Sequence, residues 1–213
     1  MVFKRKPRSW GRTLAEAVYP RGGWLRAVWY VAYRLRRLPD PAHKISRGIA
    51  AGVFVCFTPF YGLHFLLAAG LAWIIRGNLL ASLLATFFGN PLTFPLIASV
   101  SVETGYALMN KGGHMPLPKV VSAFSQTSVE LWRNFRALFG PERMHWAHLD
   151  GFFYDVFLPY LVGGIVPGAV CAVLAYMASR PLIAAYQRAR IKRLKTRFAK
   201  SREKAARRVG QNT

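Results

Sequence analysis

Acidic residues are scarce in this chain, which has 8 Asp and Glu residues against 30 Lys and Arg residues and a formal net charge of +22. Cysteine is scarce too, and the 2 cysteines lie inside apolar stretches, which excludes a disulfide framework. The sequence has no phosphate-binding loop of the G-x-x-x-x-G-K-[ST] or G-x-G-x-x-G type, no serine elbow and no pair of catalytic carboxylates. We therefore expect no enzymatic activity, no metal site and no cofactor.

Charge is also missing from three long stretches. Residues 48–75, 77–102 and 156–179 contain no Asp, Glu, Lys or Arg, and the apolar character of the second stretch continues to residue 110, interrupted by Glu103. A helix needs roughly 20 apolar residues to cross the hydrocarbon core of a bilayer. The alternative, buried helices of a soluble protein, would leave too little polar surface to cover them in a chain this short. The sequence therefore predicts an all-α, polytopic membrane protein.

Basic residues are concentrated at the two ends of the chain. Of the 30 Lys and Arg residues, twelve lie in residues 1–47 and twelve in residues 180–213. Because positively charged flanks of membrane helices stay in the cytoplasm, we predict a multi-pass protein of the bacterial inner membrane with both termini cytoplasmic. Insertion already explains this charge, so we expect no specific nucleic acid partner. The first apolar stretch begins too late for a cleavable signal peptide.

The charge pattern and the apolar stretches divide the chain into three parts. These are a basic cytoplasmic N-terminal segment (1–47), a membrane domain (48–180) and a basic cytoplasmic tail (181–213). Amphipathic spacing over residues 24–38 predicts a helix that lies on the membrane surface, and similar spacing in the loop 111–153 predicts a second interfacial helix. The tail from Gln187 to Arg208 is expected to form a basic helix.

Proline interrupts the first two apolar stretches near their middles, at Thr58-Pro59 and at Asn90-Pro91. As one helix, the 28 residues of 48–75 would span roughly 42 Å, against a hydrocarbon core of about 30 Å. We therefore expect this stretch to fold back as a re-entrant hairpin that returns Arg76 to the cytoplasmic side. The second stretch would then cross outward and the third would cross back. Two re-entrant hairpins, or a split third stretch, are the alternatives.

The two interruptions also define a candidate site. Thr58 and Asn90 can each cap a helix N-terminus, and proline is favoured at the position that follows a cap. Two helix N-termini that face each other would form a pocket for an anion, as broken helices do in transporters. Prolines that only kink the spans are the alternative. The candidate ligand-binding residues are Thr58, Pro59, Tyr61, Gly62, His64, Arg76, Asn78, Asn90, Pro91, Thr93 and Glu103.

Two of these candidates carry expectations of their own. Carboxylates within membranes are costly and usually paired, so we expect Glu103 to pair with Arg76 or Lys111. His64, a single histidine in an apolar stretch, is interpreted as a packed interfacial residue in preference to a ligand or a proton carrier.

Several short motifs carry a family resemblance. They are Phe57-Thr58-Pro59-Phe60-Tyr61-Gly62-Leu63-His64, Arg76-Gly77-Asn78 and Gly89-Asn90-Pro91-Leu92-Thr93. With the preceding Pro-Asp-Pro and the spacing of Gly48 and Gly52, these motifs resemble the domain of unknown function 2062 family of bacterial membrane proteins, over roughly residues 24–180. The resemblance implies a protein of the Gram-negative envelope and brings no activity with it.

These observations favour a protein that transports or flips an anionic or lipid-linked group through a site made by the broken helices. The basic surface helices would gather lipids with anionic headgroups. The alternative is a membrane scaffold that recruits a partner through its basic ends. A second copy of the chain or another envelope protein is the partner that the sequence leaves open.

Overall fold

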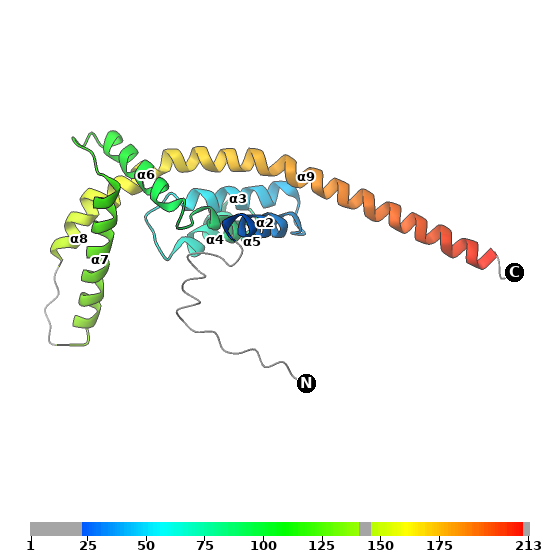
Figure 1. Ribbon diagram of the computed structural model, residues 1–213, viewed down its shortest axis with the longest axis horizontal. Coiled ribbons are helices and arrows are strands. Elements are labelled where there is room, and N and C mark those ends of the chain that lie inside the picture. Colours follow the sequence, from blue (N-terminus) through cyan, green and yellow to red (C-terminus); the bar gives the residue numbers. More distant parts are fainter. Residues whose placement is uncertain (1–22, 141–145, 211–213) are drawn as a thin grey trace.

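The chain is helical through most of the two ranges that this computed structural model describes, residues 23–140 and 146–210 (Figure 1). No strand occurs in these ranges, so the predicted all-α fold is confirmed for them. Part of the predicted basic N-terminal segment, residues 1–22, lies outside the described residues, as do 141–145 and 211–213. The elements in chain order are α2 (Gly23–Arg36), α3 (Ala42–Val55), α4 (His64–Ile74), α5 (Leu79–Ala85), the 3₁₀ turn η1 (Thr86–Phe88), α6 (Phe94–Leu108), α7 (Leu117–Ala137), α8 (Ala147–Phe152), the π-helical turn η2 (Phe153–Phe157) and α9 (Leu158–Gly210).

Helix α9 is the longest element, and helices α3 and α6 pack against it (Figure 1). Its 53 residues span about 80 Å, and Pro167 and Pro181 lie inside it. The third apolar stretch is therefore not split, and the boundary expected between membrane domain and tail falls within one helix. Leu149–Lys200 is the one helical segment of the described chain that is long and apolar enough to cross a membrane. The basic tail is helical, as predicted.

Small residues bring the helices into close contact. On α3, Gly48 and Gly52 face α5, and an added Cβ would overlap the carbonyl oxygen of its capping residue Asn78 or that of Ser82. The same holds where α6 crosses α9: a Cβ on Gly105 would meet the Pro159 carbonyl, and a Cβ on Gly163 would meet the backbone of α6. Small residues spaced by four allow such backbone contact, and membrane helices commonly associate in this way.

Helices α3 and α4 form an antiparallel hairpin. The chain leaves the end of α3 through residues 56–63, and α4 then returns to the level at which α3 began. Two hydrogen bonds to backbone carbonyls fix this return: the Asn78 N–H donates to the Lys44 carbonyl at 2.9 Å, and an Arg47 guanidinium nitrogen donates to the Ile75 carbonyl at 3.5 Å. From there α5 runs beside α3 again, and the Cys56 thiol reaches the Thr86 carbonyl at 3.4 Å.

The region beyond α6 forms a second helical pair, α7 with α8, which extends away from α9 (Figure 1). The helix predicted within the loop 111–153 is confirmed as α7. A small core joins the pair to the rest through Val102 of α6, Val120 of α7, and Val156 with Tyr160. Trp132 and Phe135 of α7 and Phe139, just after its end, remain exposed, and the Phe135 ring contacts the other two.

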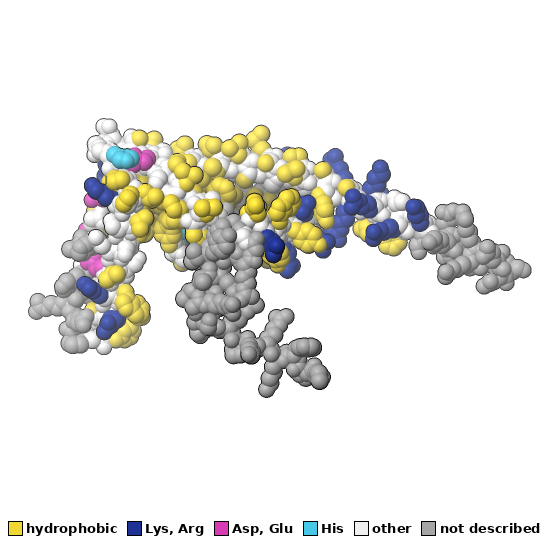
Figure 2. All heavy atoms as spheres, in the orientation of Figure 1, with side chains coloured by type: hydrophobic (Ala, Val, Ile, Leu, Met, Phe, Trp, Pro, Cys, Tyr) yellow, Lys and Arg dark blue, Asp and Glu magenta, His cyan; other side chains and the backbone are white. Residues whose placement is uncertain are grey.

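Apolar side chains cover the outside of the body, and basic side chains gather along the tail of α9 (Figure 2). Trp73 of α4 is 75% exposed and Leu182 of α9 is 69% exposed. The helix predicted at 24–38 is confirmed as α2, which exposes Leu25 and Trp29. An apolar outer surface of this kind, with the long apolar helix, suits association with a membrane.

Candidate functional site

The candidate residues predicted from the sequence fall in three separate places. The first is the central junction, which we define as the two turns at residues 56–63 and 89–93. The second is the turn between α4 and α5, which holds Arg76 and Asn78. The third is Glu103, near the end of α6. The central junction contains Thr58, Pro59, Tyr61, Gly62, Asn90, Pro91 and Thr93, and His64 follows its first turn as the first residue of α4.

Thr58 does not cap a helix. Its hydroxyl donates to the Val55 carbonyl at 2.8 Å, and α4 begins at His64, with Leu63 in the capping position and no side-chain cap. The prediction of a helix start at Thr58-Pro59 is therefore wrong. The reason is Gly62, whose φ of +85° belongs to the left-handed region and interrupts a helix. His64 contacts the turn from the other side, with its Nε2 at 3.3 Å from the Thr58 carbonyl oxygen.

Asn90 holds the second turn. Its side-chain oxygen accepts hydrogen bonds from the backbone N–H groups of Leu92, at 2.9 Å, and Thr93, at 3.2 Å. The Thr93 hydroxyl in turn accepts from the Asn90 N–H at 3.1 Å. Helix α6 begins only at Phe94, with Thr93 in the capping position and no side-chain cap, so the helix start predicted at Asn90-Pro91 is also wrong, by a few residues. The Asn90 oxygen does accept backbone N–H groups, as expected of a cap, but they belong to the turn that precedes α6.

Tyr61 lies where the first turns of α4 and α6 meet. Its ring makes edge contacts with His64, Phe94 and Phe124, at centroid distances of 5.6, 4.6 and 4.8 Å. Its hydroxyl donates to the hydroxyl of Tyr160, 3.1 Å away, and the Tyr160 side chain is fully buried against α6. One aromatic residue therefore joins the α3–α4 hairpin, α6 and α9.

An apolar groove of about 310 Å³ opens beside Tyr61, between α6 and α7. Its walls are aromatic rings and aliphatic side chains, while the side chains of Thr58, Asn90 and Thr93 hydrogen-bond within their own turns. The groove therefore suits an apolar chain, such as the tail of a lipid, better than a free anion. The groove is lined by Tyr61, Phe94, Pro95, Ala98, Leu117, Val120, Val121 and Phe124.

Asn78 joins three segments at the opposite end of the hairpin. Its side-chain oxygen accepts the Ala81 N–H at 2.6 Å and so caps α5, while its amide donates to the Asp40 carboxylate. Gln187 of α9 donates to the Asp40 carbonyl at 2.9 Å. Arg76 lies in the same turn, with a φ of 55°. These contacts give Asn78 a clear structural role at the base of the hairpin.

Glu103 pairs with His114, whose Nδ1 lies 2.7 Å from a carboxylate oxygen. Neither predicted partner is correct. Arg76 lies at the far end of the fold, and Lys111 reaches Asp155 at 3.2 Å. The loop after α6 turns back over the end of that helix, and it is this turn that brings a histidine to the carboxylate.

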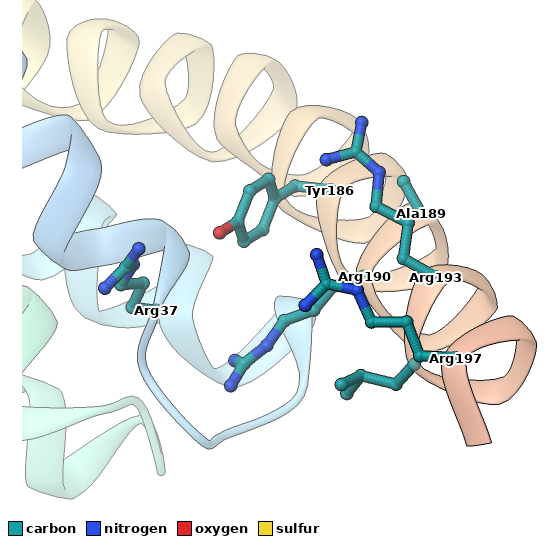
Figure 3. A pocket seen from close by; sticks show the side chains of 7 residues that line it. Arg37, Tyr186, Ala189, Arg190, Arg193 and Arg197 are labelled. Carbon is teal, nitrogen blue, oxygen red and sulfur yellow. The ribbon is translucent and has the colours of Figure 1, made fainter. Parts of the chain in front are cut away.

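Sequence reasoning missed a basic groove of about 520 Å³ between the end of α2 and the tail of α9 (Figure 3). We call this the arginine groove. Figure 3 shows arginines reaching it from both helices, with the ring of Tyr186 between them. The spacing of the tail arginines was visible in the sequence, whereas the approach of Arg37 is a tertiary contact. The arginine groove is lined by Arg37, Tyr186, Ala189, Arg190, Arg193, Leu194 and Arg197.

Comparison with known protein families gives a match over most of the chain. The model of the family described as "Uncharacterized protein conserved in bacteria (DUF2062)" matches residues 25–192. This range runs from α2 into the basic tail and so includes the central junction and most of the arginine groove. No curated protein and no solved structure matches the chain.

Proposed function

Because the chain belongs to the DUF2062 family of uncharacterized bacterial proteins, we propose a function from the geometry of its site. The protein is a multi-pass protein of the inner membrane that moves an anionic lipid or lipid-linked group between the two leaflets. The observation that carries the proposal is the meeting of α4 and α6 at Tyr61, beside an apolar groove. We assign no catalytic residue to this process.

The hairpin supports the proposed topology. Its first arm, α3, has 14 residues and spans about 21 Å, which is less than the hydrocarbon core of about 30 Å. Its second arm returns to the level of Lys44 and Arg47. A hairpin with these dimensions enters from the cytoplasm and leaves on the same side. The broken segment α5–α6 then crosses outward and α9 crosses back, which keeps both basic ends in the cytoplasm.

The central junction supports movement of a lipid. At membrane depth, non-helical backbone is tolerated only where protein buries it or water reaches it. Both turns of the junction lie side by side, since Cys56 at the start of one reaches Thr86 just before the other. The apolar groove beside them would hold a lipid tail, with the ring of Tyr61 in its wall.

Lipid movement can be tested with purified protein in liposomes that contain fluorescent phosphatidylglycerol. A membrane-impermeant reductant bleaches the outer leaflet, and active protein exposes the inner-leaflet label to it. The variant Asn90→Leu removes the oxygen that holds the second turn, so we expect it to stop the movement. Thr104→Val is the control, because the Thr104 hydroxyl bonds only its own helix, to the Val100 carbonyl. Wild-type protein that moves no anionic lipid would refute the proposal.

A specific observation favours the alternative, a membrane scaffold. Helix α9 continues as a basic helix for more than five turns after Gln187, which donates a hydrogen bond to Asp40 in the connection between α2 and α3. A tail of this kind is suited to binding an acidic partner. Truncation after Gln187 would then abolish the function, while Asn90→Leu would leave it intact. If the protein moves lipids, Asn90→Leu instead abolishes its function, so the two variants separate the alternatives.

A further inference from the structure

We infer that the arginine groove is a binding site for the phosphate of a lipid headgroup that carries two negative charges, such as a phosphomonoester. The site lies at the end of the molecule away from the central junction. The inference rests on the proposed membrane topology and is independent of the proposed lipid movement.

The tail arginines that line the groove gather on one side of α9. Arg190, Arg193 and Arg197 are spaced by three and four residues, so at 3.6 residues per turn they lie within roughly 60° of one another around α9. All three line the groove. The opposite side of the same helix carries Arg188, Lys192 and Lys195, none of which lines the groove. The basic tail is therefore not uniform, because one side of it lines the arginine groove and the other does not.

Contacts between the end of α2 and α9 preorganise the groove. Arg37, the residue just after α2, lines the groove. The neighbouring Arg36 stacks over the Tyr186 ring, with its guanidinium carbon 5.4 Å from the ring centroid. Gln187 donates to the Asp40 carbonyl and so fixes the connection after α2 against α9. These contacts hold the two walls of the groove together before any ligand binds, which lowers the entropic cost of binding.

The positive charge of the groove is not balanced by acidic side chains among its described lining residues. Four guanidinium groups line a groove of about 520 Å³, and no Asp or Glu is among its described lining residues. Guanidinium groups bind phosphate oxygens in pairs, through two parallel N–H donors. A headgroup with one negative charge would leave most of this charge unbalanced. A phosphomonoester, with up to two negative charges and three free oxygens, suits it better.

The position of the groove points to a lipid as the source of the phosphate. Leu182, which is apolar and largely exposed, precedes Arg190 on α9 by about 12 Å along the helix axis. On the other wall, α2 exposes Leu25 and Trp29. The groove therefore opens where apolar surface ends and basic surface begins, which corresponds to the headgroup layer of a bilayer. Leu194, inside the groove, is a contact for the first methylene groups of a chain.

The test is native mass spectrometry of the full chain in detergent, titrated with dioctanoyl phosphatidic acid, dioctanoyl phosphatidylcholine or inorganic phosphate. The groove variant R190Q/R193Q/R197Q should bind phosphatidic acid about tenfold more weakly or worse. The matched control R188Q/K192Q/K195Q removes the same charge from the opposite side and should change binding less than about twofold. Phosphatidylcholine should bind weakly to every protein.

A third variant, R190K/R193K/R197K, keeps the charge and removes the paired donors of guanidinium, so an intermediate loss is expected. Equal weakening by the groove and control variants would overturn the inference, because it would show diffuse attraction to the whole tail. Inorganic phosphate that binds as tightly as phosphatidic acid would overturn the lipid assignment. An RNA oligonucleotide that binds more tightly than the lipid, and is lost with the groove variant, would assign the groove to nucleic acid instead.

Discussion

Replacement of Gly163 by alanine should destabilise the protein, and the reason lies in the contact between α6 and α9. A Cβ at residue 163 would overlap the carbonyl oxygen of Ser101 and the backbone of Gly105. Every atom that it would meet most closely is backbone, so no side chain can rotate to make room. The two helices must therefore separate along their whole contact, and the packing around Val102 and Tyr160 would loosen with them.

The size of this effect follows from two opposing contributions. Overpacking typically costs about 1–3 kcal/mol, and backbone overlap places Gly163→Ala at the upper end. Replacement of glycine by alanine inside a helix also stabilises by about 0.5–1 kcal/mol. We therefore expect a net loss of about 2 kcal/mol in the free energy of unfolding. Gly70→Ala is the matched control, since Gly70 lies within α4 and a Cβ there meets nothing within 4 Å. It should be neutral or stabilising by about 0.5–1 kcal/mol.

The measurement is unfolding in mixed detergent micelles, followed by the fluorescence of the 6 tryptophans. The order of stability should be Gly70→Ala, then the wild type, then Gly163→Ala. If Gly163→Ala were as stable as Gly70→Ala, the helices would not be in backbone contact at this point. The reasoning from small residues would then be wrong for the α6–α9 contact, and the position of the central junction against α9 would need revision.

Three further predictions concern the ends of the helices and the topology. Asn78→Ala should lower the free energy of unfolding by about 1–2 kcal/mol, because it removes the cap of α5 and the bond to Asp40, and detergent unfolding measures it. Lys111→Met should cost less than about 1 kcal/mol, since its ion pair with Asp155 is partly exposed; a larger loss in the same assay would contradict this. Single cysteines can be introduced into the Cys171→Ser variant and expressed in intact cells. A membrane-impermeant maleimide should then label Gly112→Cys but not Arg76→Cys. Labelling of Arg76→Cys from outside would show that the hairpin does not return to the cytoplasm.

Much of the helical pattern could be predicted because it depends on local properties of the sequence. Long charge-free stretches favour helices, and the prolines near Thr58 and Asn90 mark the two interruptions. The helix within the loop 111–153 and the basic tail follow from spacing and composition in the same way. What these patterns do not determine is the residue at which each helix begins. The left-handed backbone at Gly62 delays α4 to His64, and no side-chain pattern before it indicates that delay.

The parts of the candidate site that depend on distant contacts could not be predicted. Glu103 has two cations that are reasonable partners by sequence, yet the loop after α6 places His114 on it at 2.7 Å. The arginine groove needs the end of α2 to lie beside α9, and Arg37 and Arg190 are far apart in the sequence. Their proximity follows from the Gln187–Asp40 contact, which is visible only in the fold.

The distance between the two candidate sites separates the proposed functions. Tyr160, which bonds Tyr61 at the central junction, and Arg190, in the arginine groove, are 30 residues apart on α9, or about 45 Å. This distance exceeds the hydrocarbon core of about 30 Å, so no single lipid can contact both sites at once. If the protein moves lipids, a headgroup must leave the arginine groove before its lipid reaches the central junction. The variant R190Q/R193Q/R197Q should then slow lipid movement at low lipid concentration but leave the rate unchanged at saturating lipid. A scaffold has no such requirement: its groove would hold one lipid in place, and Asn90→Leu would change neither binding nor the function of the tail.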